Sequence, residues 1–210
     1  MPAKRVLVLG ATGSIGTSTL DIIRSQKERY ICCGISANNN KDSLLSLAEE
    51  FKCPSSLTSQ EGNEGIKKLI ETSKPDIVVN GIAGSAGLIP SLLTLESGTD
   101  LALANKESVV MAGPLIFAKA REKDCHIIPV DSEHSAIFTL ISAFGEKNID
   151  QLIITASGGP FRNYTKEQLK TVTLQDALKH PTWNMGQKIT VDSASLANTG
   201  LEVIEACRLF

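Results

Sequence analysis

The stretch RVLVLGATGSIG, residues 5–16, decides the fold of this chain. Its first half is a run of leucine and valine that ends in glycine, which is typical of a buried strand in a parallel sheet. Gly10, Gly13 and Gly16 follow at GxxGxxG spacing, and a helical pattern follows them. Such a turn lets the backbone approach a ligand closely, and the helix N-terminus attracts a pyrophosphate. Glycine spacing alone is weak evidence, and a purely structural turn is the alternative.

Strand and helix patterns alternate from this turn to about residue 130. Short apolar runs predict strands, and apolar residues at three- and four-residue spacing predict the helices between them. This alternation predicts an α/β fold with a doubly wound parallel sheet of the Rossmann type. The predicted strands are 5–10, 30–36, 76–84, 101–105 and 125–130, and the predicted helices are 17–29, 44–51, 66–70, 88–97, 109–122 and 133–144.

The pattern changes after residue 131. We expect 1–131 to be an NADP-binding domain and 132–210 to be an incomplete α/β catalytic domain. A strand is predicted over 151–157, and the polar stretch 158–188 has few apolar anchors, which favours a flexible flap. The last ten residues have a helical pattern without a glycine cap or a polar tail, so a fragment of a longer protein is expected.

Composition excludes several classes of protein. The net charge is −2 without a polybasic run, so neither nucleic acid nor an anionic membrane is an expected partner. No apolar run reaches the roughly 20 residues that span a bilayer. The first strand begins too early to leave room for a signal peptide, so a cytoplasmic location is expected. The five cysteines are odd in number and form no CxxC pair, which favours reduced core residues and no zinc site.

The end of the second predicted strand bears on the choice of cofactor. Enzymes that use NAD usually have an acidic residue there, which holds the ribose hydroxyls. Here the strand runs into Asn38, Asn39, Asn40 and Lys41, which would tolerate a 2′-phosphate and favour NADP. The alternative is that the asparagines only form a loop. The expected cofactor contacts are Thr12, Gly13, Ser14, Ile15, Asn38, Asn39 and Asn40.

One common class of dehydrogenase is excluded by the two tyrosines. Short-chain dehydrogenases use a tyrosine with a lysine four residues later. Tyr30 is followed at that spacing by Gly34, and Tyr164 by Gln168. That catalytic pair is therefore absent from the sequence.

Carboxylates mark a candidate metal site. Asp131 and Glu133 follow the predicted strand 125–130, at the edge where open α/β sheets bind ligands, although a helix start explains them equally well. Glu202, in the last helix, adds a third carboxylate. An oxygen-only set suits Mg²⁺ or Mn²⁺ and does not suit zinc. Neutral hydrogen-bonding groups suited to phosphate are Ser157, Ser193 and Asn198.

Six motifs together resemble the 1-deoxy-D-xylulose 5-phosphate reductoisomerase family over the whole chain. They are GATGSIG, LANKES (103–108), PVDSEH (129–134), TASGGPF (155–161), HPTWNMG (180–186) and DSASLANTGLEVIEA (192–206). The resemblance implies an NADPH- and divalent-metal-dependent homodimer of the non-mevalonate isoprenoid pathway. It would rearrange a small phosphorylated ketose and reduce the resulting aldehyde, giving 2-C-methyl-D-erythritol 4-phosphate.

The resemblance also implies roles for single residues. The implied metal ligands are Asp131, Glu133 and Glu202, which with Lys106 form the implied catalytic set. The implied substrate contacts are Lys106, Ser132, Glu133, Ser157, His180, Trp183, Ser193, Asn198, Thr199 and Glu202, and the further cofactor contacts are Asn105, Glu107 and Gly186. Some of these have a structural alternative: Trp183 could be ordinary packing, His180 a loop residue, and Lys106 with Glu107 a helix-start charge pair. His134 is assigned only to the first turn of a helix.

Two departures from the family pattern leave other functions open. Thr199 stands where the family usually has a lysine, so a charge facing the substrate phosphate is missing. Family members are also much longer than this chain. The alternatives are a truncated nucleotide-binding fragment without turnover and a related NADP-dependent reductase acting on another sugar phosphate.

Overall fold

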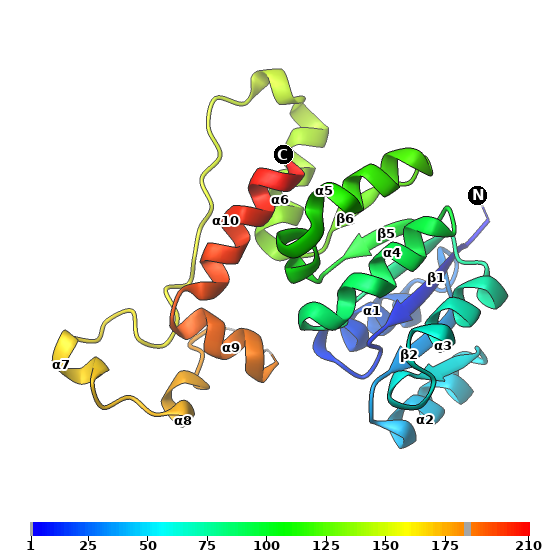
Figure 1. The fold of residues 1–210 in the computed structure, drawn as a ribbon, viewed down its shortest axis with the longest axis horizontal. Helices are drawn as coiled ribbons and strands as arrows, with labels where there is room; N and C mark the ends of the chain where they lie inside the picture. The colour runs from blue at the N-terminus through cyan, green and yellow to red at the C-terminus, as the bar shows by residue number, and fades with distance from the viewer. Residues whose placement is uncertain (1, 183–185) are drawn as a thin grey trace. The chain divides into compact units, whose positions relative to one another are not determined.

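The computed structural model describes residues 2–182 and 186–210. The chain divides into two compact units, Met1–Phe138 and Thr139–Phe210. The first unit is an α/β domain, and the second is built from helices joined by long connections (Figure 1). No helix in the described ranges is long and apolar enough to cross a membrane.

The first unit contains a six-stranded, wholly parallel sheet. Its strand order is β3-β2-β1-β4-β5-β6, so the chain winds outward from β1 in one direction and from β4 in the other. This order is that of a doubly wound dinucleotide-binding sheet, which confirms the predicted fold class. The strands are β1 Lys4–Leu9, β2 Tyr30–Ala37, β3 Ser55–Leu57, β4 Ile77–Asn80, β5 Asp100–Leu103 and β6 Ile127–Pro129.

Helices cover both faces of this sheet, as its two-sided burial requires. On one face, Val6 and Val8 of β1 pack with Leu20 of α1 and Leu44 of α2. On the other face, Leu7 and Leu9 pack with α3, and a third cluster joins β5 to α4 and α5. The helices of this unit are α1 Ser14–Ser25, α2 Lys41–Phe51, α3 Thr58–Ser73, α4 Leu88–Glu96 and α5 Lys106–Glu122, with a short 3-10 turn at Gly84–Gly87.

The second unit begins inside α6, Ser132–Phe144, which contains the boundary between the units. Two one-turn helices, α7 and α8, each begin with a capping box, in which a threonine and a residue three positions later exchange hydrogen bonds. The helices of this unit are α7 Lys166–Leu169, α8 Leu174–Ala177, α9 Gln187–Ala194 and α10 Ala197–Leu209, with a 3-10 turn at Glu146–Asn148.

Two sequence predictions are corrected here. The predicted strand 151–157 is irregular, and Ile153 on it is 75% exposed. A strand needs a neighbour for its backbone groups, and the sheet of the described residues lies wholly in the first unit. The cysteines were predicted to be reduced core residues. All five thiols are free, and Cys32 and Cys33 are buried, but Cys207 is exposed.

Candidate functional site

The glycine turn leads directly from β1 into α1. Gly13 precedes the helix, whose N-terminus has no capping side chain and no acidic residue in its first turn. Gly13, Ser14 and Ile15 are exposed, whereas Gly16 is buried. The backbone N–H groups of this helix end can therefore donate hydrogen bonds to an anion, and the turn lies at the point where the winding of the sheet reverses.

Two of the three glycines are required by close backbone contacts. Gly10 has φ +79°, and a Cβ on it would lie 3.0 Å from the backbone of Gly81 in the loop after β4. A Cβ on Gly16 would lie 2.3 Å from the carbonyl oxygen of Gly10 and 2.5 Å from Cα of Ala11. The tight turn thus depends on the missing side chains, as the sequence predicted.

Ser36, near the end of β2, holds the glycine turn in place. Its carbonyl oxygen accepts a hydrogen bond of 2.7 Å from Ala11 N, and its Oγ accepts one of 3.4 Å from Gly10 N. The side chain is fully buried. Sequence reasoning did not single out this residue.

The three asparagines after β2 have different environments. Asn40 caps α2, because its Oδ1 accepts a hydrogen bond of 3.2 Å from Ser43 N. Asn38 Oδ1 accepts from the Thr58 hydroxyl at 3.3 Å, which leaves its amide nitrogen to donate. Asn39 and Lys41 are exposed beside them. Donors suited to a phosphate group are therefore Asn38, Asn39 and Lys41.

Two buried asparagines hold the loops after β4 and β5. Asn80 Nδ2 donates to Gly87 O at 2.9 Å and to Ser91 Oγ at 2.8 Å. Asn105 Nδ2 donates to Ile82 O at 2.8 Å and to Gly84 O at 2.7 Å, while its Oδ1 accepts from Ser108 N at the start of α5. The Asn105 side chain, expected to contact the cofactor, is thus engaged within the protein and positions the loop. Its sequence signal, an asparagine after a strand, resembles that of any turn.

Lys106 and Asp131 form an ion pair at the carboxyl edge of the sheet. Lys106 is the first residue of α5 and Asp131 follows β6, and their side chains are 5% and 12% exposed. Pairing offsets the cost of removing both charges from water. Lys106 and Glu107 do stand at the start of a helix, and Asp131 is a buried partner of Lys106. The structure thereby brings together two residues of the implied catalytic set.

The start of α6 carries the rest of the motif PVDSEH. The Asp131 carbonyl oxygen accepts from Ser135 N at 2.8 Å, which begins the helix. Ser132 is exposed, and its hydroxyl donates to Glu133 Oε2 at 2.6 Å. His134, assigned only to a helix turn by the sequence, is fully buried.

In the second unit, Ser157 and His180 are in direct contact. His180 Nδ1 accepts from Thr182 N at 3.2 Å, so a neutral ring carries its proton on Nε2. His180 Nε2 lies 3.0 Å from Ser157 Oγ and donates to it, and Ser157 Oγ also accepts from Gly159 N at 3.2 Å. Both lone pairs of the Ser157 hydroxyl are then used, and its proton is available to donate to a ligand.

Two further contacts of this unit involve residues that are expected to bind phosphate or metal. Gly159 has φ +66°, and a Cβ on it would lie 2.5 Å from the carbonyl oxygen of Ser193, so Gly159 packs tightly against the end of α9. Asn198 Nδ2 donates to Glu202 Oε1 at 2.5 Å, one turn along α10. Glu202 is 3% exposed. A buried carboxylate is costly unless it is hydrogen-bonded or binds a cation, so the Glu202 environment suits a metal ligand.

The remaining predicted residues of this unit are less defined by contacts. Thr199 is half-buried in the first turn of α10, and exposed Gly186 precedes α9 as its N-cap. Glu205, on the same face of α10 as Glu202, is 1% exposed, although no role was predicted for it. Trp183 lies outside the described residues.

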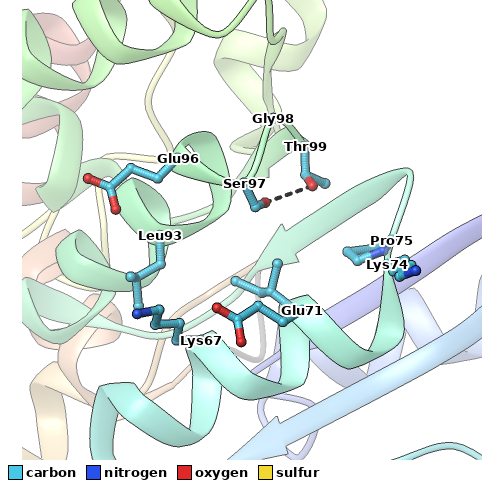
Figure 2. Close-up of a pocket in the computed structure, with 10 residues that line it drawn as sticks. Lys67, Glu71, Lys74, Pro75, Leu93, Glu96, Ser97, Gly98 and Thr99 are labelled. Atoms are coloured by element: carbon cyan, nitrogen blue, oxygen red, sulfur yellow. Dashed lines mark hydrogen bonds between the residues drawn. The ribbon is translucent and has the colours of Figure 1, made fainter.

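A separate hollow of about 640 Å³ lies between α3 and α4 (Figure 2). It borders Lys74 and Pro75 before β4 and Ser97–Thr99 before β5, so it lies at the amino ends of these strands, away from the glycine turn. Its charged side chains are mixed in sign, and it contains none of the predicted site residues. The hollow is therefore separate from the predicted site at the carboxyl edge.

The fold and the residues at the carboxyl edge of its sheet define an α/β dinucleotide-binding protein with a second, helical unit rich in hydroxyl and carboxylate side chains. Residues 6–61 and 54–113 match the family model of 1-deoxy-D-xylulose 5-phosphate reductoisomerase, and residues 127–210 match the model of its C-terminal domain. The chain belongs to the 1-deoxy-D-xylulose 5-phosphate reductoisomerase family.

Relatives agree with this assignment along the whole chain. The 1-deoxy-D-xylulose 5-phosphate reductoisomerases of Treponema denticola and Treponema pallidum are 54% and 51% identical, and both matches cover 100% of this chain. A solved DOX-P reductoisomerase in complex with NADPH, fosmidomycin and magnesium matches with a TM-score of 0.89 at 38% identity, over 99% of this chain. The chain spans 58% and 57% of the two relatives and 58% of that solved chain.

Proposed function

We propose that this chain carries the cofactor-binding unit and the metal-binding carboxylates of a 1-deoxy-D-xylulose 5-phosphate reductoisomerase. The reaction would convert 1-deoxy-D-xylulose 5-phosphate into 2-C-methyl-D-erythritol 4-phosphate. The observation that carries the proposal is that one edge of one sheet bears both an uncapped glycine turn and the buried Lys106–Asp131 pair. Relatives whose names and ligands match this chemistry support it.

NADPH is the cofactor that the first unit suits. The glycine turn would hold the pyrophosphate at the N-terminus of α1, and the donors of Asn38, Asn39 and Lys41 would hold the 2′-phosphate, since the stretch from the end of β2 to Lys41 contains no carboxylate. When bound, the nicotinamide supplies the hydride. The solved relative from Zymomonas mobilis, 36% identical to this chain, contains NADPH.

Asp131, Glu133 and Glu202 would hold a magnesium or manganese ion. All three offer hard carboxylate oxygens. The buried Glu202 carboxylate accepts a hydrogen bond from Asn198, which offsets part of the cost of burying its charge. A divalent ion bound there would polarise the oxygens of a substrate carbonyl and hydroxyl. Lys106, paired with Asp131, would add a positive charge near these oxygens.

The residues of the second unit would bind the substrate phosphate and close over it. Ser157 would donate its hydroxyl proton, since His180 and Gly159 occupy its lone pairs. Ser193, Asn198 and Thr199 would add neutral donors, and 158–188 would act as the flap. We also propose a homodimer in the cytoplasm, with 1–131 as the NADP-binding domain and 132–210 as the catalytic domain.

Oxidation of NADPH, followed by its absorbance, tests the proposal. We expect consumption only when 1-deoxy-D-xylulose 5-phosphate and Mg²⁺ are both present. Retained NADPH binding without turnover would instead support a nucleotide-binding fragment. Turnover with a different sugar phosphate, and not with this one, would support a related reductase.

A further inference from the structure

Two cysteines of the first unit that have no role in the proposed function lie against each other. Cys32 is in β2, and Cys53 follows α2, with their sulfur atoms 3.9 Å apart. Cys32 is 5% exposed and Cys53 is half-buried. A disulfide requires the sulfurs to approach to about 2.05 Å. The pair is therefore reduced and in van der Waals contact, and a displacement smaller than one bond length on each side would join it.

The strand geometry selects this pair. Successive side chains of a strand point to opposite faces, so Cys32 packs with α1 and α2, whereas Cys33 packs with α3. Cys53 packs against the same cluster as Cys32. Cys125 lies elsewhere in the unit, with its sulfur against the Leu95 carbonyl oxygen. Cys32 is thus positioned to react with Cys53, and Cys33 is not.

The local backbone permits the remaining approach. Cys53 lies in the turn between the left-handed residue Lys52 and Pro54, outside both α2 and β3. Its N–H donates to Ala48 O at 3.2 Å. Turns adjust more readily than a central strand, so movement would fall on Cys53 and leave the ladder of β2 intact.

The two thiols also differ in reactivity. The hydrogen bond between the two thiols lowers the pKa of Cys53, whereas this hydrogen bond and burial raise the pKa of Cys32. Because the thiolate is the nucleophile, the partly exposed Cys53 sulfur is the one that an oxidant meets first. Cys32 is then placed as the second thiol of the reaction.

We propose that Cys32 and Cys53 form an oxidation site at which hydrogen peroxide converts the two thiols into a disulfide. The Cys53 thiolate attacks one peroxide oxygen, an S–O bond forms, the O–O bond breaks, and the leaving hydroxide takes up the Cys53 proton as water. The Cys32 sulfur then attacks the sulfenic sulfur, the S–S bond forms, and the oxygen leaves as water with the Cys32 proton. The two cysteines lose two electrons, and the peroxide gains them.

The disulfide would join β2 to the turn that follows α2. The connection between β2 and α2 contains Asn38–Lys41, the residues proposed to hold the cofactor phosphate. A cross-link that joins the end of α2 to β2 constrains the unfolded chain, so we expect the midpoint of thermal unfolding to rise by roughly 5–10 °C on oxidation.

Peptide mapping after peroxide treatment tests this site. The reduced chain is treated with hydrogen peroxide, its remaining thiols are alkylated, and its peptides are identified by mass spectrometry. We expect loss of two of the five thiols, a Cys32–Cys53 linked peptide, and reversal by dithiothreitol. Cys53→Ser should abolish the linked peptide, and the matched variant Cys33→Ser should retain it.

Three results would overturn the proposal. They are oxidation of Cys53 to sulfinic acid without a cross-link, a cross-link that includes a different cysteine, and a linked peptide that disappears in Cys33→Ser. Mapping of the unsubstituted chain decides the first two, so the test does not depend on how Cys53→Ser folds. Circular dichroism of both variants verifies that their folds are comparable.

Discussion

A single buried amide holds the first unit's loops at the proposed active site. Asn105 donates to two carbonyl oxygens of the loop after β4 and accepts from the start of α5, where Lys106 begins the helix. Its position therefore determines where the Lys106–Asp131 pair lies. Removing such a group leaves buried carbonyls without partners, which costs more than one hydrogen bond contributes.

We expect Asn105→Ala to lower the free energy of unfolding by about 2–3 kcal/mol. Urea denaturation measures this change. Asn105→Asp keeps the acceptor for Ser108 but places oxygen against the carbonyls of Ile82 and Gly84, so it should destabilise at least as strongly. An Asn105→Ala protein as stable as the parent would show that the hydrogen bonds do not hold the loop.

Thr199 is the residue at which substrate binding is expected to improve. A lysine there would restore a charge-assisted hydrogen bond to phosphate, which is worth roughly 1.5–3 kcal/mol, or about ten- to a hundred-fold in binding. The Michaelis constant for 1-deoxy-D-xylulose 5-phosphate should fall accordingly in Thr199→Lys. Val203→Lys, with the same charge one turn along α10, is the control and should have little effect. An unchanged Michaelis constant in Thr199→Lys would rule out this role.

At the scale of elements, the turn between β1 and α1 depends on contacts between backbones. In Gly16→Ala the added Cβ would lie 2.3 Å from the Gly10 carbonyl oxygen, so α1 must shift away from the strand. We expect a loss of about 3 kcal/mol in unfolding free energy and weaker NADPH binding. Gly200, inside α10, has no atom within 4 Å of an added Cβ. Gly200→Ala should therefore stabilise by up to about 1 kcal/mol, and equal effects of the two variants would contradict the packing argument.

The one-turn helix α8 depends on an ionised carboxylate. Hydrogen bonds from Thr173 and Lys179 lower the pKa of Asp176 from 3.8 to about 2. Because the folded pKa is the lower one, this stabilisation is present above about pH 4 and is lost as the pH falls toward 2. A carboxyl NMR titration should give a midpoint near 2, and Thr173→Ala should raise it. A midpoint near 3.8 in the unsubstituted chain would show that the capping box does not form in solution.

Patterns in the sequence predicted most elements of the first unit, because buried parallel strands have distinctive apolar runs. They missed β3, which consists of Ser55, Ser56 and Leu57 and has no such run. They wrongly predicted a strand at 151–157, because an apolar run indicates only that a segment could pair and does not supply its partner. Buried polar side chains such as Asn80 and Ser36 were missed for a similar reason, since their hydrogen bonds depend on distant loops.

At the scale of the whole molecule, the implied catalytic residues are divided between the two units. Asp131 and Glu133 are in the first and Glu202 is in the second. Combined motifs in the sequence predicted the family, whereas the contacts that hold each group required coordinates. The proposed activity therefore requires both units, and a variant of one carboxylate tests whether they share a metal.

The most direct test of the proposed function is the rate of Mg²⁺-dependent NADPH oxidation by Glu133→Gln. The change removes a charge that a divalent ion needs and keeps the side chain nearly the same size, so we expect a fall of about a hundred-fold or more with NADPH binding retained. Glu146→Gln, an exposed residue of the 3-10 turn after α6, is the matched control and should leave the rate unchanged. Metal-dependent turnover by Glu133→Gln near the parent rate would contradict the account.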